Sequence, residues 1–250
     1  MGVCSLLIAT GSLQAQSKAD MKALIKTQFN FAAKQYKLLA EKTPAEKMPQ
    51  TFNPKTGKST FSNMQWWCSG FFPGTLWMIY EQTGDKAIKA EAEKKLVELA
   101  PMKHYKGNHD LGFMINCSFG NAFKLTRDPA YAKTLDTAAA TLALRYRPHV
   151  HAIQSWDKSK NFTCPVIIDN MMNLELLCWV SQHTGDTSYL HIAREHANTT
   201  MKNHFRPDYS SYHVIDYNPA TGAVIAKRTW QGANDSSSWA RGQAWGLYGY

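Results

Sequence analysis

The chain has 250 residues, enough for one large domain or two small ones, and its formal net charge at pH 7 is +9. The Lys and Arg residues are scattered without a block of like charges, which argues against a nucleic-acid-binding protein, because such proteins carry a clustered basic stripe. No apolar stretch in the sequence is long enough to span a membrane.

The first 15 residues resemble the end of a secretory signal. A short apolar run is followed by Leu13-Gln14-Ala15, a site where a signal peptidase could cleave. A basic segment before the apolar run is missing, so we expect the natural start to lie upstream. We therefore expect a signal remnant over residues 1–15, one domain over residues 16–250, and a periplasmic or secreted protein.

Residues 20–42 have the composition of a first helix, with an apolar stripe formed by Leu24, Phe31 and Leu38. Residues 43–64 are polar and lack this periodicity, so we expect a loop there. The helix and the loop lead to Trp66-Trp67, which precede the first strongly apolar helical segment.

Three later segments share one order of elements: an apolar helix, a short turn that ends in Asp, a second helix, and a long loop. The turns are Thr83-Gly84-Asp85, Thr126-Arg127-Asp128 and Thr184-Gly185-Asp186. Gly can take the left-handed conformation that closes a helix, and Asp can cap the helix that follows. Short turns make the paired helices antiparallel neighbours. The repeat predicts a toroid of helical hairpins, with apolar inner and amphipathic outer helices.

The rest of the chain predicts an all-α class with small β excursions. An apolar run interrupted by Asn218-Pro219 predicts a hairpin within residues 212–228, and residues 150–156 predict a short strand. A fourth inner helix is expected to open near residues 234–238, which offer several capping side chains. It continues as WARGQAWGLYGY without a turn or an outer partner, so we expect a toroid that is incomplete at its C-terminus.

Four cysteines follow the leader, at Cys68, Cys117, Cys164 and Cys178, and none has metal-binding spacing. Cys117 and Cys178 lie in apolar helices, so we expect buried free thiols there. The spacing assigns no disulfide.

Polar residues recur at the N-terminal ends of successive inner helices. Asp110 and Asp169 occupy two of these ends, and the segment 239–245 occupies another. In a toroid of helical hairpins these ends gather around one central funnel. Trp faces suit sugar rings, and the planar guanidinium of Arg241 suits a carboxylate. The alternatives are that both Asp residues are helix caps and that His109 is a structural histidine.

The motifs WCSGFFPG, HDLGF, Asp169-Asn170 before MMNLELL, and SSSWARGQAW resemble the bacterial unsaturated glucuronyl hydrolases. The resemblance covers the chain after the leader and implies an (α/α)₆ toroid. It implies that Asp169 is the catalytic acid/base and that Asp110 is the second essential carboxylate. The substrate-binding residues that it implies are Trp67, His109, His213, Gln231, Trp239, Arg241 and Trp245.

This resemblance also implies a reaction. The substrate is an anionic unsaturated disaccharide or oligosaccharide of the glycosaminoglycan type, left by a polysaccharide lyase with a C4=C5 double bond in its terminal uronic acid. Protonation of C4 and addition of water at C5 hydrate this enol ether, and the product then releases the next sugar. No metal or organic cofactor is implied. Three alternatives stay open: an unsaturated rhamnogalacturonyl hydrolase, a non-catalytic sugar-binding toroid, and an ordinary inverting glycosidase.

Overall fold

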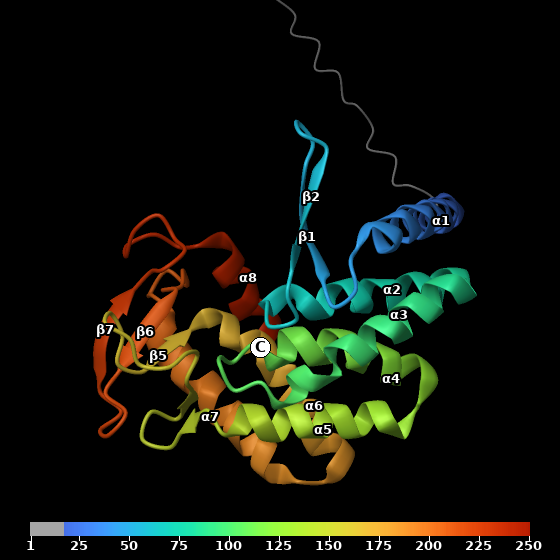
Figure 1. Cartoon of the computed structure of the whole chain (residues 1–250). Coiled ribbons are helices and arrows are strands. Elements are labelled where there is room, and N and C mark those ends of the chain that lie inside the picture. Colours follow the sequence, from blue (N-terminus) through green and yellow to red (C-terminus); the bar gives the residue numbers. More distant parts are fainter. Residues whose placement is uncertain (1–17) are drawn as a thin grey trace, which may run out of the picture.

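The computed structural model describes residues 18–250 and consists mainly of helices packed side by side (Figure 1). The predicted leader over residues 1–15 lies outside the described residues. The α-helices are α1 (Lys18–Lys42), α2 (Phe71–Thr83), α3 (Lys86–Leu99), α4 (Asn121–Thr126), α5 (Pro129–Ala143), α6 (Leu174–Thr184), α7 (Thr187–His204) and α8 (Ala240–Gly249). The 3₁₀ helices are η1 (Trp67–Gly70), η2 (Ala100–His104) and η4 (Ile168–Asn173), and η3 (Gly112–Gly120) is a π-helix. The strands are β1 (Met48–Asn53), β2 (Lys58–Ser62), β3 (Tyr146–Arg147), β4 (Ala152–Ile153), β5 (Pro165–Ile167), β6 (Val214–Tyr217) and β7 (Val224–Arg228).

The three predicted hairpins are confirmed. The pairs are α2 with α3, the continuous η3–α4 segment with α5, and α6 with α7. Gly84 and Gly185 close their helices in the left-handed region, at φ values of 67° and 81°. The side chain of Asp85 accepts hydrogen bonds from the backbone N–H groups of Ala87 and Ile88, as expected for a helix cap. The later turns are capped in the same way, by Asp128 and Asp186.

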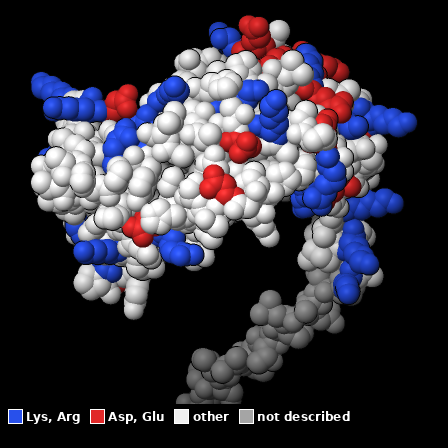
Figure 2. All heavy atoms as spheres, turned by 90° about the horizontal axis from the view of Figure 1, so that it is seen from below, with Lys and Arg blue, Asp and Glu red and all other residues white. Residues whose placement is uncertain are grey.

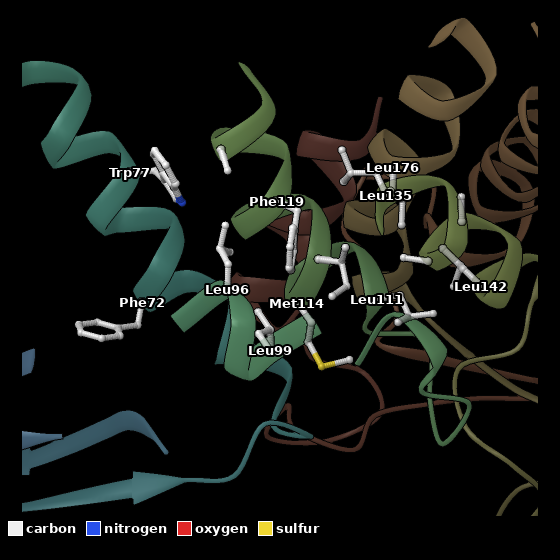
Figure 3. Close-up of a cluster of buried hydrophobic side chains, with 14 of the residues drawn as sticks. Phe72, Trp77, Leu96, Leu99, Leu111, Met114, Phe119, Leu135, Leu142 and Leu176 are labelled. Carbon is white, nitrogen blue, oxygen red and sulfur yellow. The ribbon is translucent and has the colours of Figure 1, made fainter. Parts of the chain in front are cut away.

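The main core lies between these hairpins (Figure 3). The inner segments contribute large apolar side chains, such as Trp77 from α2 and Met114 from η3, and the outer helices contribute residues such as Leu96 and Leu135. These four side chains are at most 2% exposed. Burial of a large apolar side chain stabilises the fold by about 1.5–3 kcal/mol, so this core holds the inner segments in register.

A three-stranded antiparallel sheet, in the order β5-β6-β7, lies at one end of the helices (Figure 1). Strands β6 and β7 form the predicted hairpin, which is confirmed. Strand β5 pairs with β6 and leads directly into η4, so its pairing in the sheet fixes the position of Asp169 in the first turn of η4. Strand β4 pairs with β3, in agreement with the short strand predicted for residues 150–156.

The prediction of a polar loop over residues 43–64 is wrong. Strands β1 and β2 pair in an antiparallel hairpin that projects from the helical body (Figure 1). The Asn53 side chain accepts hydrogen bonds from the backbone N–H groups of Lys55 and Thr56, which stabilises the turn. Both faces of this hairpin carry mostly polar, exposed side chains. The strands therefore lack the alternation of apolar and polar residues by which a strand is predicted from sequence.

Three further expectations need correction. The stripe of Leu24, Phe31 and Leu38 is exposed, because α1 packs through its opposite face around Ala33. Cys178 is exposed and Cys117 is half-buried, rather than both being buried, although all four cysteines of residues 18–250 are free as expected. Helix α8 begins only at Ala240 after Trp239, without a side-chain cap, and Asn234, Ser236 and Ser237 bond to one another in a turn that precedes it.

Within the part of the chain that the structure describes, no helix is both long and apolar enough to cross a membrane. The face of the molecule seen in Figure 2 carries basic and acidic side chains interspersed, with no continuous basic stripe.

Candidate active site

A cavity of about 330 Å³ lies where the inner helical segments meet the three-stranded sheet. Six of the nine predicted site residues line this cavity. They are Trp67, His109, Asp110, Asp169, Gln231 and Arg241. Five separate segments of the chain supply these side chains, and the predicted convergence of the inner-helix ends is observed.

The two carboxylates are not helix caps. Asp110 stands just before the π-helix η3, whose start has no side-chain cap. Asp169 lies in the first turn of η4, which also begins without a side-chain cap, and it is only 8% exposed. Both side chains therefore remain available to the cavity, and the capping alternative is wrong.

Burial raises the pKa of Asp110 above its usual range. The charge of Asp169 raises the pKa of Asp110 further, whereas the neighbouring His109 and Arg145 act in the opposite direction. A carboxyl group with a raised pKa holds its proton at a higher pH than a free Asp side chain does. Asp110 can therefore retain a proton for donation.

Each carboxylate faces a buried imidazole. His109 Nε2 lies 3.3 Å from Asp110 Oδ1, and His213 Nε2 lies 3.4 Å from Asp169 Oδ1. Both histidines are 2% exposed. His213 does not line the cavity, and it reaches the site through Asp169.

Arg241 lies among aromatic rings at the cavity wall. Its guanidinium carbon is 4.3 Å from the centre of the Trp239 ring and 5.5 Å from that of Trp67. Its Nη2 donates a hydrogen bond to Gln231 Oε1 at 2.7 Å. These contacts hold the planar guanidinium of Arg241 at the cavity, and the hydrogen bond to Gln231 fixes its orientation.

Trp239 and Trp245 do not line the cavity, but they contact residues that do, namely Arg241 and Trp67. Trp245 packs edge to face against Trp67 and Phe113, with ring centres 6.5 and 5.1 Å apart. Its position four residues after Arg241 brings both to the Trp67 ring, as the helical spacing predicted. The geometry therefore makes Trp245 a support for Trp67.

Several site residues were missed by the sequence analysis. Trp156 and Trp230 line the cavity beside the predicted residues. Asn173 does not line the cavity, but it contacts Gly112 and the cavity residue His109. The position of Trp230 next to Gln231 could have indicated it, whereas Asn173 reads as an ordinary polar residue within an apolar helix.

Among residues 18–250, no group of three or more His, Cys, Asp or Glu side chains is arranged to hold a metal ion.

Comparison with known proteins identifies the family. No family model matches the chain. It is 50% identical over 186 residues to the unsaturated glucuronyl hydrolase of Formosa agariphila, an alignment that covers 74% of this chain and 46% of that protein. The chain belongs to the unsaturated glucuronyl hydrolase family. It is also 35% identical over 189 residues to the unsaturated glucuronyl hydrolase of Bacillus sp. strain GL1, an alignment that covers 74% of this chain and 50% of that protein.

The solved structures of this family agree with the fold. A crystal structure of an unsaturated glucuronyl hydrolase specific for heparin matches with a TM-score of 0.85 and 46% identity, over 90% of this chain and 60% of that chain. A mutant of the enzyme from Streptococcus agalactiae complexed with dGlcA-GalNAc6S matches with a TM-score of 0.73 and 28% identity, over 95% of this chain and 58% of that chain. The predicted (α/α)₆ fold class is confirmed. The chain spans about half the length of the curated relatives that it matches.

Proposed function

We propose that this protein removes the 4,5-unsaturated uronic acid from lyase-generated oligosaccharides of the glycosaminoglycan type. The observation that carries the proposal is the cavity in which Asp110, Asp169 and Arg241 converge with Trp67, in a chain of the unsaturated glucuronyl hydrolase family. The similarity to a structure of an enzyme specific for heparin and to a structure complexed with dGlcA-GalNAc6S supports this substrate class.

The cavity offers complementary groups for a sugar acid. Arg241 supplies a planar guanidinium for the uronic carboxylate, and Gln231 orients it through the 2.7 Å hydrogen bond. Trp67 and Trp230 supply aromatic faces for the pyranose rings. The predicted roles of these residues in substrate binding remain part of the proposal.

The reaction begins with proton transfer from the carboxyl pair to C4 of the unsaturated ring, with Asp169 as the acid/base. Positive charge then develops at C5 and is shared with the ring oxygen. Water then adds at C5 and gives one of its protons to the carboxylate as the C5–O bond forms. The resulting hemiketal opens and expels the next sugar. The raised pKa of Asp110 supports the proposal, because this carboxyl group keeps a proton at the cavity at a higher pH than a free Asp side chain does.

An absorbance assay tests the activity. The full-length protein is incubated with unsaturated disaccharides prepared by lyases from heparin, chondroitin and pectin-type rhamnogalacturonan. We expect loss of the ultraviolet absorbance of the C4=C5 bond with the glycosaminoglycan products. Turnover of the pectin product alone would indicate a rhamnogalacturonyl hydrolase, and binding without loss of absorbance would indicate a non-catalytic sugar-binding protein.

Turnover in heavy water tests the chemistry. Hydration of the enol ether places a solvent deuteron on C4, which mass spectrometry and NMR of the released uronic product can detect. A conventional glycosidase delivers water to the anomeric carbon and leaves C4 untouched. Turnover without deuterium at C4 would exclude hydration. Product incubated in heavy water after turnover in ordinary water controls for later exchange.

We also propose that the protein is exported to the periplasm or secreted. The support is the apolar run and cleavage pattern within residues 1–15. N-terminal sequencing of the protein isolated from fractionated cells tests this, and an intact leader on a cytoplasmic product would contradict it.

A further inference from the structure

We propose that Asn173 and the backbone amides of Trp230 and Gln231 hold His109 and His213 in the Nε2–H tautomer. Each imidazole then donates its N–H to Oδ1 of one catalytic carboxylate, which leaves Oδ2 of that carboxylate to exchange the proton with substrate. The consequence for catalysis rests on the proposed function, whereas the tautomers themselves do not.

The tautomer of His213 follows from its backbone partners. The N–H groups of Trp230 and Gln231 both point at His213 Nδ1, at 3.0 and 3.1 Å. A backbone N–H can only donate, so Nδ1 must carry a lone pair, and the proton of the neutral ring is on Nε2.

The Nε2–H group of His213 faces one acceptor, Asp169 Oδ1. His213 Nε2 and Asp169 Oδ1 lie 3.4 Å apart and are both buried, and neither has a hydrogen-bond partner among residues 18–250. The separation is longer than a good hydrogen bond. Hydrogen bonds at catalytic sites are often long without substrate and shorten in the complex. We infer that this contact closes when substrate occupies the cavity.

The tautomer of His109 follows from two buried asparagines. Asn170 Nδ2 donates to the backbone oxygen of Ile153 at 2.7 Å, which leaves Asn170 Oδ1 as an acceptor. Gly112 N–H donates to Asn173 Oδ1 at 2.9 Å, so the amide nitrogen of Asn173 points the other way. These backbone partners fix the orientation of both amides.

Asn173 Nδ2 donates to Asn170 Oδ1 at 3.1 Å and lies 3.4 Å from His109 Nδ1. His109 Nδ1 therefore faces a donor, and the neutral ring carries its proton on Nε2, 3.3 Å from Asp110 Oδ1. Gly112 and Asn173 are tightly packed, because a Cβ atom on Gly112 would collide with Asn173. Asn173 is thus a positioning residue that acts on Asp110 through His109.

The His109–Asp110 and His213–Asp169 pairs have the same arrangement of donors and acceptors. In both, an N–H donor occupies Nδ1 and Nε2 faces a carboxylate oxygen. A neutral imidazole held in this way has no free lone pair with which to compete for the proton that Asp169 and Asp110 exchange with substrate. It also restrains the carboxylate in one rotamer, which pre-organises the proton transfer.

The tautomers are tested directly by ¹⁵N NMR on full-length protein with labelled histidine. At neutral pH we expect His109 and His213 to be neutral, with a pyridine-like Nδ1 and a pyrrole-like Nε2. His109→Gln and His213→Gln assign the signals by their loss. A pyrrole-like Nδ1 or an imidazolium at either residue would overturn the proposal.

Asn173→Asp tests the link to catalysis. One oxygen of the new carboxylate still accepts from Gly112 N–H, while the other accepts from His109 and draws its proton to Nδ1. We expect the His109 signals to exchange character, the His213 signals to stay, and kcat to fall roughly 10- to 100-fold with little change in KM. Asn203→Asp, at a half-buried site bonded to Tyr217, is the matched control and should leave the His109 signals and kcat unchanged. Unchanged His109 signals in Asn173→Asp would overturn the proposal.

A second pair of variants keeps the proposal testable if Asn173→Asp does not fold. The amide nitrogen of Gln reaches the place of Nε2, and that of Asn reaches the place of Nδ1. His109→Gln should therefore keep roughly tenfold more kcat than His109→Asn. Equal losses in the two variants would contradict the role of the Nε2 donor. If no substrate is turned over but the NMR pattern is found, only the proposed function fails.

Discussion

At the scale of single residues, Asp169 has the position that acid/base catalysis requires. It is buried, lies at the cavity, and has no capping role that would occupy its oxygens. Asp169→Asn keeps the shape of the side chain and removes the ionisable group. We expect turnover to be abolished while circular dichroism and substrate binding stay close to wild type. Asp208→Asn, at an exposed turn, is the control. Turnover near the wild-type rate in Asp169→Asn would refute the assignment.

Arg241 is the second residue on which the proposal depends. Arg241→Lys keeps the positive charge and loses the planar fork that stacks on Trp239 and bonds to Gln231. We expect kcat/KM on unsaturated disaccharides to fall about tenfold or more, which corresponds to ~1.4 kcal/mol. The exposed Arg194→Lys serves as the control. An unchanged kcat/KM would make Arg241 a structural residue.

At the scale of elements, the Asp caps explain why the hairpins turn where they do. Asp128 Oδ1 accepts a 2.8 Å hydrogen bond from Ala130 N–H at the start of α5, where Pro129 occupies the first helical position. Asp128→Ala should lower the free energy of unfolding by about 0.5–2 kcal/mol in denaturant titrations. Asp128→Asn retains the acceptor and should cost much less. Equal losses in both variants would show that the cap contributes little.

Helix α7 buries two histidines that stay neutral. Burial is the main cause that lowers the pKa of His196 to about 3 and that of His204 to about 4. In the unfolded chain both would have pKa values near 6.5. Between roughly pH 6.5 and 4 the unfolded state therefore binds more protons, and the free energy of unfolding falls as the pH is lowered.

The pH dependence of thermal unfolding checks this effect. His196→Asn removes the titrating ring and can keep an acceptor for the N–H of Ile153, which His196 Nδ1 bonds at 3.0 Å. We expect a shallower loss of stability between pH 6.5 and 4 than in the wild type. The exposed His149→Asn should retain the wild-type slope. Identical slopes in all three proteins would contradict the account.

At the scale of the whole molecule, the chain has a net charge of +9, basic and acidic side chains are interspersed on the face seen in Figure 2, and the proposed substrate is an anion. A broad positive field attracts anions, and salt screens it over a length that falls from about 30 Å at 0.01 M to about 3 Å at 1 M. We expect KM for a sulfated unsaturated disaccharide to rise with NaCl over this range, with a smaller change in kcat. An unsulfated disaccharide should respond less. A KM independent of salt would show that only local contacts matter.

Local signals in the sequence determined the helical hairpins, the capped turns and the β6–β7 hairpin. Each depends on residues a few positions apart, such as Gly185 next to Asp186, so neighbouring residues suffice to specify it. The placement of Asp110 and Asp169 at the ends of inner helical segments followed from the repeat. Their assignment as catalytic residues came from the family resemblance.

Tertiary structure alone decided which side chains meet. Asn173 contacts Gly112 across 61 residues of sequence, and His213 reaches Trp230 through the β6–β7 hairpin. The same holds for α1, whose apolar stripe faces outward because its other face packs on the core. Such choices depend on distant partners that compete for the same side chain. The local sequence pattern cannot predict which partner is chosen, because the hydrogen bonds and contacts that decide it form only when the chain has folded.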